Sequence, residues 1–423
     1  MRRTIPGLGD DREFLKLWVG GFVSTLGFHV SILAMQLTAA AVLGATPFEM
    51  GVLGAAQFLP RLVFGLVAGA WVDRMRRRPV MIVADVGRAV LLASVPIAYA
   101  LHALTIAQLV VVALGVGSFS VFFGVASQAY LPVLVGRPNV VVANARMSAG
   151  EAVAQIAGPN LAGVLVQLIT APIAIAADAL SYVGSAVSIL WIRRPEPPID
   201  RPTGRRDLAA EIREGLAVVR GNAVLRALVV AALTIGFFTG GIRGSLIVLY
   251  LVGIGVSPVE FGLIYGVGGA AALVGALAAR PITSALGVGR AVILVQVAMA
   301  AFAGAVPLAG AVAADVRLPL LLAGQIGLGI VSPTWGITGG SLLQVLTPDR
   351  LLGRVNATQQ LALFGINPIG AITGGFLATL IGLQATLAAA AVGAGLTAVV
   401  LLMSPVRRLR DIPSSPDVAA TRS

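Results

Sequence analysis

Cysteine is absent from the 423-residue sequence, and it contains only two histidines. Without cysteine, neither a disulfide framework nor a thiolate metal site is possible. His29 and His102 are too far apart in the sequence to indicate a zinc motif, so we expect no metal site and no cofactor. No pattern typical of a catalytic nucleophile, a metal centre or a phosphate-binding loop is visible. We therefore predict no catalytic residue and do not expect an enzyme.

Charged residues are also scarce. They make up 11% of the chain, against 57% hydrophobic residues and a mean hydropathy of +0.94. A soluble domain of this size cannot bury that much apolar surface, so the composition predicts an all-α polytopic membrane protein. The net charge of +12 does not indicate a nucleic-acid partner, because the basic residues fall between apolar runs and form no patch.

Apolar runs of about 20 residues, the length that spans a bilayer, divide the chain into predicted helices. We count twelve, over residues 14–43, 48–72, 80–101, 104–130, 139–170, 172–192, 223–252, 257–279, 289–312, 316–346, 352–381 and 383–404. The N-terminus lacks a cleavable signal pattern, so the first run is expected to remain as a membrane anchor. Runs longer than 25 residues favour tilted or kinked helices.

Arginines occur mainly in alternate loops between these runs, and Arg317 is the exception that we find in the opposite set of loops. The positive-inside rule then predicts both termini and the central loop in the cytoplasm, with the chain in the plasma (inner) membrane. The central segment is the main break in composition. It begins with a proline-rich stretch, and the spacing of apolar residues over 207–220 predicts an amphipathic helix along the membrane surface.

An internal repeat divides the chain into two halves. Pro47-x-Glu49-x-Gly51 recurs as Pro258-x-Glu260-x-Gly262, an offset of 258 − 47 = 211 residues. Other pairs recur at offsets of 209 and 212. Two halves of six helices each are the arrangement of parallel-repeat transporters. The expected organisation is a six-helix bundle over 1–192, a cytoplasmic linker over 193–222, a second six-helix bundle over 223–404 and a cytoplasmic tail over 405–423.

The most strongly charged loop runs from Gly65 to Pro79, between the second and third apolar runs. It resembles the signature loop of the major facilitator superfamily, Gly-x-x-x-Asp-Arg-x-Gly-Arg-Arg. The matching residues are Gly69, Asp73, Arg74, Arg77 and Arg78. Arg76 stands where the pattern has glycine, and a non-glycine residue resists the positive φ of a tight turn. The resemblance implies a transporter with twelve transmembrane helices in two six-helix bundles.

The charged loop has a physical rationale in alternating access. In the inward-closed state, Asp73 is expected to dock at the N-terminus of the eleventh helix, near Gly353 and Asn356, where the helix dipole favours a carboxylate. The simpler alternative is that the arginines only set the topology. In the third helix, Asp85 and Arg88 are three residues apart and are expected to pair, as a structural pair rather than a substrate site.

Small residues and proline in the fifth helix, Gly158-Pro159-x-x-x-Gly163, resemble the Gly-Pro-x-x-Gly-Gly motif of exporters in the superfamily. The eleventh helix carries the related Asn367-Pro368-x-Gly370, followed by Gly374-Gly375. Small residues permit close helix approach, and proline frees a backbone carbonyl. Ordinary helix packing by small residues is the alternative for any single glycine. As a whole, the motif favours efflux.

Polar side chains within the apolar runs are candidates to line a substrate or proton cavity, because ionisable groups at that depth usually face a cavity or one another. The candidates are His29, Gln36, Arg61, Glu151, Asp178 and Arg243. Helix-to-helix hydrogen bonding is the competing interpretation, above all for Asp178. The favoured cavity residues are Arg61 and Glu151.

Within the superfamily, the sequence resembles the twelve-helix efflux group that includes macrolide and siderophore exporters. The motifs that carry this resemblance are Asp73-Arg74, Asp85-x-x-Arg88, Tyr130-Leu-Pro, Ala143-Asn144-Ala145 and Gly158-Pro159. This resemblance implies a monomeric secondary transporter that exports an amphiphilic small molecule, such as a drug, antibiotic or siderophore, by proton antiport. The predicted fourth helix, 104–130, lacks the arginine that many proton-driven drug exporters carry there. A lipid or lysolipid flippase, an uptake symporter and a non-transporting membrane sensor remain as alternatives.

Overall fold

Helices form all the regular structure of the described residues, which are 11–65, 67–196 and 208–411 of the computed structural model. The predicted all-α class is confirmed for this part of the chain. Eleven helical segments in it are long and apolar enough to cross a bilayer. The second predicted run, 48–72, corresponds to two helices on either side of residue 66, which lies outside the described residues.

Internal contacts divide the chain into two units, and each takes a short segment from the opposite half of the sequence. Unit 1 is Met1–Gly44, Leu59–Arg206 and Ser257–Gly262, and unit 2 is Ala45–Phe58, Asp207–Val256 and Leu263–Ser423. The predicted tail beyond residue 411 and the predicted linker over 197–207 lie outside the described residues.

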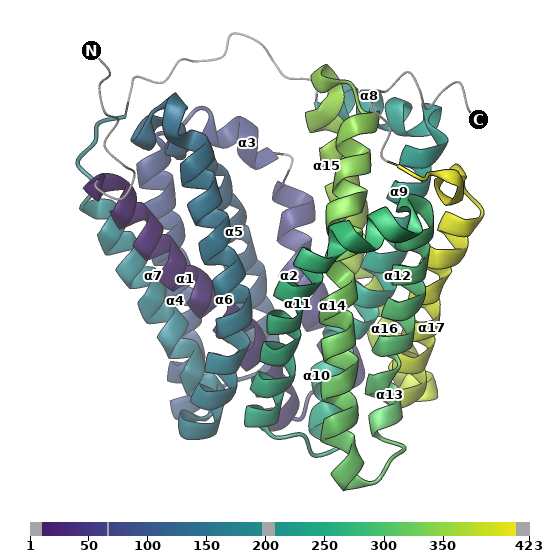
Figure 1. Ribbon diagram of the computed structural model, residues 1–423. Helices are drawn as coiled ribbons and strands as arrows, with labels where there is room; N and C mark the ends of the chain where they lie inside the picture. The colour runs from purple at the N-terminus through teal and green to yellow at the C-terminus, as the bar shows by residue number, and fades with distance from the viewer. Residues whose placement is uncertain (1–10, 66, 197–207, 412–423) are drawn as a thin grey trace. The chain divides into compact units, whose positions relative to one another are not determined.

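Unit 1 contains the helices of the first half (Figure 1). They are α1 (Arg12–Leu37), η1 (Thr38–Val42), the end of α2 (Pro47–Phe64), α3 (Val67–Val72), α4 (Arg77–Ala100), α5 (Ile106–Val135), η2 (Arg137–Asn139), α6 (Val140–Ile169) and α7 (Ala171–Leu190). Helix α1 packs on α6 and α7, and α4 packs on α5 and α7. The first turn of α1 is capped by Asp11, whose carboxylate accepts hydrogen bonds from the amides of Glu13 and Phe14.

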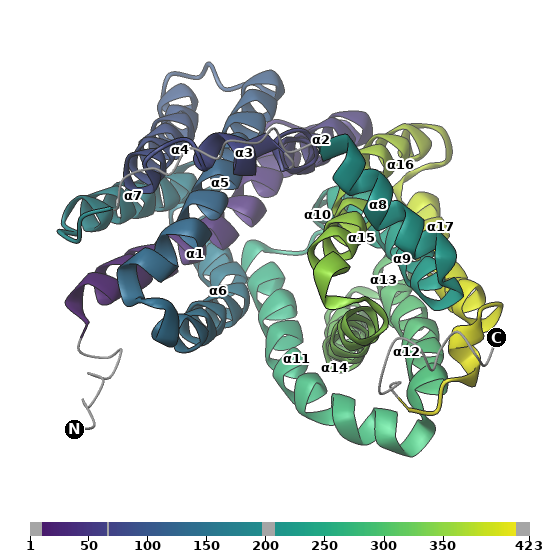
Figure 2. The ribbon, with the colours of Figure 1, turned by 90° about the horizontal axis from the view of Figure 1, so that it is seen from above.

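Unit 2 contains the helices of the second half. They are α8 (Leu208–Gly221), α9 (Ala223–Ile235), η3 (Gly236–Arg243), α10 (Gly244–Gly253), α11 (Pro258–Leu286), α12 (Val288–Ala303), α13 (Ala305–Ala309), α14 (Ala314–Leu346), η4 (Asp349–Leu351), α15 (Leu352–Gly365), α16 (Asn367–Ile381), α17 (Leu383–Leu402) and η5 (Pro405–Arg408). Helix α12 packs on α14 and α17, and Figure 2 shows this group end-on.

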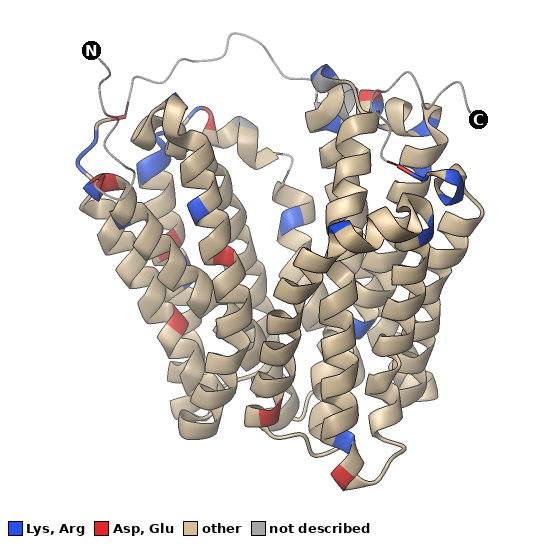
Figure 3. Cartoon of the chain, viewed as in Figure 1, with Lys and Arg blue, Asp and Glu red and all other residues tan. Residues whose placement is uncertain are grey.

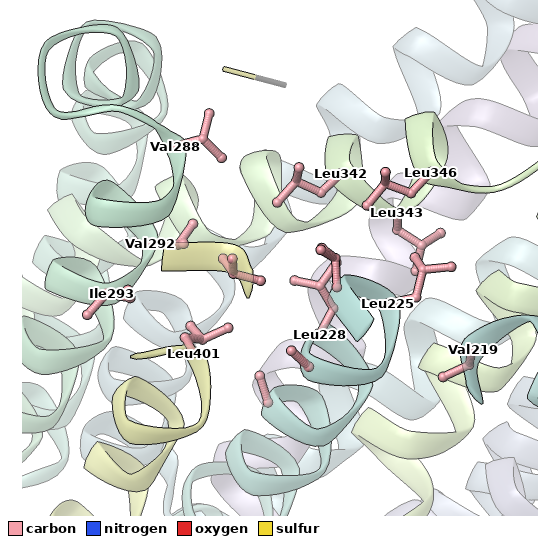
Figure 4. Close-up of a cluster of buried hydrophobic side chains, with 14 of the residues drawn as sticks. Val219, Leu225, Leu228, Val288, Val292, Ile293, Leu342, Leu343, Leu346 and Leu401 are labelled. Carbon is pink, nitrogen blue, oxygen red and sulfur yellow. The ribbon is translucent and has the colours of Figure 1, made fainter. Parts of the chain in front are cut away.

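A cluster of buried aliphatic side chains forms one core of unit 2 (Figure 4). It joins Leu225 and Leu228 of α9, Val292 of α12, Leu343 of α14 and Leu401 of α17. Other large aliphatic residues remain outside the core. Leu277 is 82% exposed and Leu180 is 70% exposed, although both lie in candidate membrane spans. In a polytopic membrane protein, such side chains face lipid.

The predicted amphipathic helix is present as α8, which packs on α9 and α15. Glu214 of α8 forms an ion pair with Arg354 of α15. Gly215 permits this close approach, because a Cβ at that position would lie 2.8 Å from the carbonyl oxygen of Arg354. Helix α8 is therefore packed against other helices of unit 2.

The sequence repeat marks two helix starts of the same construction. At the start of α2, the amide of Thr46 donates to the carboxylate of Glu49 at 2.8 Å, and the amide of Glu49 donates back to the Thr46 hydroxyl at 3.3 Å. At the start of α11, Ser257 and Glu260 make the same pair of bonds, at 2.7 and 3.3 Å. Both are capping boxes, which satisfy amide groups that the helix leaves free.

Candidate functional site

A cavity of about 480 Å³ lies within unit 1, among α1, α4, α5, α6 and α7. Its volume is in the range of cavities that hold drug-sized molecules. The lining combines five aromatic residues with small polar side chains and two charges. It consists of Trp18, Gly21, Phe22, Ser24, Thr25, Phe28, Arg88, Ser120, Phe123, Ser127, Gln128, Leu131, Asn144, Met147, Ser148, Gly150, Glu151 and Tyr182.

Glu151 of α6 is the carboxylate in this lining, and half of its side chain (52%) is exposed. Its Oε1 lies 3.4 Å from Nε2 of His29 on α1. Gly158, two helical turns beyond Glu151, permits α1 to approach, because a Cβ there would clash with the side chain of His29. The predicted cavity candidates His29 and Glu151 are thus neighbours, and the glycine of the fifth-helix motif places them together.

Arg88 of α4 is the cation in this lining, and its side chain is buried. It forms an ion pair with Asp85, and its guanidinium lies against the rings of Phe123 on α5 and Tyr182 on α7. The guanidinium also donates to the hydroxyl of Ser120 at 3.4 Å. Pairing, hydrogen bonding and aromatic contact together offset the cost of burying this charge.

Asp178 of α7 is fully buried (0% exposed). One carboxylate oxygen accepts a hydrogen bond from the hydroxyl of Ser181 at 3.0 Å, and Oδ2 has no hydrogen-bond partner among the described residues. Gly27 of α1 packs directly on this carboxylate, where a Cβ would clash. Ionisable groups at such a depth usually face a cavity or one another.

The polar groups of unit 2 form a separate arrangement around η3, a π-helical segment. Arg243 ends this segment, and in the described part of the chain its Nε has no hydrogen-bond partner. It lines two small cavities, one with Tyr265 and Gln325 and one with Gln296. A π-helical segment leaves backbone carbonyls misaligned, and such segments are frequent at functional sites.

Asn367 supports the same segment from α16. With its amide oriented to satisfy the surrounding groups, the NH₂ donates to the carbonyl oxygens of Leu363 at 2.8 Å and Gly236 at 2.9 Å. The Asn367 side chain therefore links the last turn of α15, which contains Leu363, to the start of η3, which contains Gly236. Pro368 follows in the first turn of α16, where its missing amide hydrogen costs least.

The charged loop leads into α4 without a left-handed residue. Arg76, which stands in the glycine slot, adopts φ −66° and ψ 127°, and the helix begins at Arg77, two residues before Pro79. The amides of Arg77 and Arg78 donate to the carboxylate of Glu196 at 2.9 and 2.6 Å. The expected strain at position 76 is thus absent, because the chain turns in ordinary extended conformation.

The predicted partners of this loop belong to the other unit. Gly69 lies in α3 and Asp73 follows it, in unit 1, whereas Gly353 and Asn356 lie in α15, in unit 2. The docking of Asp73 at the start of α15 stays a prediction. Arg74 is exposed beside Asp73, and Figure 3 shows Lys and Arg gathered mainly at helix ends in each unit.

Comparison with known proteins places the chain in a family. The model of the Major Facilitator Superfamily matches residues 17–343. The chain belongs to the major facilitator superfamily. It is thus a multi-pass membrane transporter and not an enzyme, as predicted.

Two relatives of this transporter have been described. It is 29% identical over 383 residues to the multidrug efflux pump Tap of Mycolicibacterium fortuitum, covering 87% of this chain and 90% of the relative. It is 26% identical over 217 residues, 51% of each chain, to the uncharacterized MFS-type transporter YfiS of Bacillus subtilis (strain 168).

Solved structures of transporters share its fold. The nucleoside transporter NupG gives a TM-score of 0.70 at 13% identity, over 92% of this chain and 98% of that one. A bacterial homologue of the iron transporter ferroportin, in an inward-facing state, gives 0.71 at 15% identity, over 92% and 98%. At these identities the likeness concerns the fold alone.

The motif glycines of this transporter are points of close helix contact. Within unit 1, a Cβ at Gly163 of α6 would lie 2.5 Å from the carbonyl oxygen of Pro258 and 3.0 Å from Cα of Gly262. Within unit 2, a Cβ at Gly375 of α16 would lie 2.7 Å from the carbonyl oxygen of Pro47. The repeated helix starts therefore pack against the two motif helices.

The remaining cavity candidates lie on separate elements. Arg61 is exposed on the last turn of α2, in unit 1, and Gln36 of α1 is half-buried. Arg243 belongs to unit 2, where it lines the two small cavities described above. That Arg61 and Arg243 line a substrate or proton cavity stays a prediction.

Sequence reasoning missed most of the cavity lining. Trp18, Phe22, Phe123 and Tyr182 were not singled out, because an aromatic residue in an apolar run looks the same whether it faces lipid or a cavity. Trp18 carried one usable signal, since its indole must find an acceptor when buried, and its Nε1 donates to the carbonyl oxygen of Arg146 at 3.1 Å.

Proposed function

We propose that this transporter exports amphiphilic small molecules, such as drug-like compounds, antibiotics or siderophores, by proton antiport and alternating access. The observation that carries the proposal is the chemistry of the unit 1 cavity, an aromatic lining with one half-exposed carboxylate. Aromatic faces bind apolar and cationic groups with little directional demand. Such a lining favours an amphiphile with a positive charge.

The relationship to an efflux pump supports the direction of transport. The relative described as a multidrug efflux pump aligns over 87% of this chain. Its 29% identity gives support for export rather than uptake, and it leaves the identity of the substrate to experiment.

Two carboxylates are proposed to carry protons. Glu151 faces the cavity beside His29, where a bound cation and a proton compete for the same negative charge. Asp178 is fully buried on α7, one helical turn from the lining residue Tyr182, and its Oδ2 has no hydrogen-bond partner among the described residues. Competition between substrate and proton for a shared carboxylate is the simplest physical basis of antiport, because each species then leaves when the other binds.

The conformational roles remain as proposed from the sequence. We propose that Asp73, with Arg74, Arg77 and Arg78, docks near Gly353 and Asn356 when the cytoplasmic side is closed, with both termini in the cytoplasm. Opening of that side releases the carboxylate from the helix N-terminus. Asp73→Asn is expected to slow transport while leaving substrate binding unchanged.

Transport into proteoliposomes with an imposed pH gradient tests the proposal. A fluorescent amphiphilic cation serves as the probe. Glu151→Gln keeps the size of the side chain and removes its charge, so gradient-driven transport is expected to fall at least about tenfold. Asp315→Asn, an exposed acidic residue at the start of α14, is the matched control and is expected to transport at the wild-type rate.

Two results would overturn the proposal. One is a wild-type rate for Glu151→Gln at equal protein level, which would remove this carboxylate from substrate and proton binding. The other is transport that ignores the pH gradient in the wild-type protein, which would favour a flippase.

A further inference from the structure

A second cavity, of about 580 Å³, lies at the arginine-rich end of α4 and α7, in unit 1. We call it the basic groove. It is lined by four arginines together with apolar residues, two prolines and one glutamate: Arg76, Arg78, Arg193, Arg194, Ile82, Val83, Leu190, Pro79, Pro195 and Glu196. Apart from Arg78, which belongs to the loop proposed to dock near Gly353, no residue of this groove has a part in the proposed transport function.

The arginines of the basic groove outnumber its carboxylates. Glu196 is its one acidic residue, and both of its oxygens accept hydrogen bonds from backbone amides at the start of α4. The negative charge of Glu196 therefore interacts with the N-terminus of α4, where the helix dipole stabilises a carboxylate. The groove keeps a positive potential, since one carboxylate faces four guanidinium groups.

The four guanidinium groups differ in the hydrogen bonds and ion pairs that they form. Arg78 donates from Nε to the carbonyl oxygen of Ile189 at 3.1 Å and from Nη2 to that of Leu190 at 2.5 Å, so it caps the end of α7. Arg194 lies 3.4 Å from a carboxylate oxygen of Asp11. Arg76 and Arg193 are exposed, and neither guanidinium has a hydrogen bond or ion pair within the described residues.

The apolar side of the groove continues onto a lipid-facing surface. Val83, about two turns into α4, is 62% exposed, and Leu190 and Trp191 at the end of α7 are 52% and 66% exposed. In a membrane-spanning helix these residues contact acyl chains. Arg76 lies about 10 Å from Val83 along the helix axis, at a rise of 1.5 Å per residue. This separation matches that between the upper part of the acyl chains and the phosphate of a bilayer phospholipid.

We propose that the basic groove binds an anionic phospholipid, with Arg76 and Arg193 on its phosphate and the acyl chains along Val83 and Leu190. Guanidinium groups match phosphate oxygens in geometry as well as charge. A soluble anion would use the arginines and leave the apolar wall uncovered. The combination of free guanidinium groups with an exposed apolar wall therefore selects a lipid.

Native mass spectrometry of the full-length protein tests this proposal. The detergent-solubilised protein is equilibrated with phosphatidylglycerol and phosphatidylcholine at equal concentration, and retained lipid is counted. Arg76→Gln with Arg193→Gln is expected to weaken phosphatidylglycerol binding about 30-fold, from two surface arginines. Phosphatidylcholine binding should not change. The matched control is Arg137→Gln with Arg408→Gln, which removes two exposed arginines outside the groove and should retain the lipid.

A second readout keeps the test independent of folding yield. Phosphatidylglycerol is expected to raise the thermal unfolding temperature of the wild-type and control proteins, and to have no effect on the groove variant. Equal lipid loss in both variants would mean attraction to overall charge and would overturn the proposal. Displacement of the lipid by inorganic phosphate at the same concentration would also overturn it, because the site would then recognise a free anion.

Discussion

The guanidinium carbon of Arg88 lies 4.1 Å from the centre of the Tyr182 ring. The same guanidinium pairs with Asp85 and lies 4.4 Å from the ring centre of Phe123, so one cation links α4, α5 and α7. Asp85 is fully buried and Arg88 is 5% exposed. In such a setting the partners depend on each other, since removal of one leaves an uncompensated charge.

Arg88→Leu is expected to destabilise the protein by about 3–5 kcal/mol, because it strands the carboxylate of Asp85. The double variant with Asp85→Asn is expected to lose less, since no charge remains unpaired. Thermal unfolding in detergent measures both. The exposed Arg137 provides the control, and Arg137→Leu should unfold like the wild type. If Arg88→Leu were as stable as this control, the pair would have no structural role.

The fold class and the family could be predicted from the sequence, because composition and the length of apolar runs are direct signs of a bilayer-spanning chain. Eleven of the described segments qualify as spans, and the all-α class and family were expected from the apolar runs and the loop around Asp73. Helix ends shifted by a few residues. Arg77 begins α4 before Pro79, because proline is tolerated in a first turn.

The cavity was harder to predict. Glu151 and His29 were identified as candidates, since ionisable residues stand out in apolar runs. The hydroxyl and aromatic residues of the cavity lining, such as Ser120 and Tyr182, do not stand out in this way. Contacts across the bundle decide which face of a long apolar helix packs on a neighbour. The periodicity of hydrophobic residues along one helix does not reveal that face when both the lipid-facing and the protein-facing sides are apolar.

The capping boxes give a stability prediction for the repeated helix starts. Ser257→Ala removes the hydroxyl that accepts from the Glu260 amide, and it is expected to destabilise the start of α11 by about 1 kcal/mol. Thr46→Ala should have the same effect at α2. Ser341, an exposed hydroxyl that bonds only within its own helix, is the control. Its alanine variant should fall within about 0.5 kcal/mol of the wild type in thermal unfolding.

Asp178→Asn separates proton transfer from substrate binding. Asparagine has nearly the same shape and retains an oxygen to accept the hydrogen bond from Ser181, so the protein should fold. It carries no titratable proton. Substrate affinity, measured by fluorescence titration, is expected to stay within about twofold of wild type, while transport driven by a pH gradient should fall at least about tenfold.

The result for Asp178→Asn has two informative alternatives. Normal proton-driven transport would make Asp178 a structural residue. A matched loss of binding and transport would point to a distorted cavity, and Ser181→Ala, which removes the hydrogen bond and keeps the carboxylate, would then show the same loss.

The glycine contacts of α6 and α16 predict what a larger side chain does at each repeated helix start. At Gly163, a Cβ would lie 2.5 Å from a backbone oxygen of α11, which cannot move aside as a side chain does. Gly163→Leu is expected to destabilise the contact by about 1–3 kcal/mol or more. Because the Cβ at Gly375 meets the backbone of α2 in the same way, Gly375→Leu should have a comparable cost.

Gly184 of α7 is the matched control for these glycine variants, since it is exposed and a Cβ there meets nothing within 4 Å. Gly184→Leu should retain both stability and transport. Replacement of a glycine at an exposed helix position is even expected to stabilise the helix slightly, because glycine has a low helix propensity. Alanine at Gly163 tests the cause, because a single methyl already meets the backbone oxygen. A Gly163→Ala protein with wild-type stability and rate would show that the two helices separate without cost, and that the close contact at this motif has no part in transport.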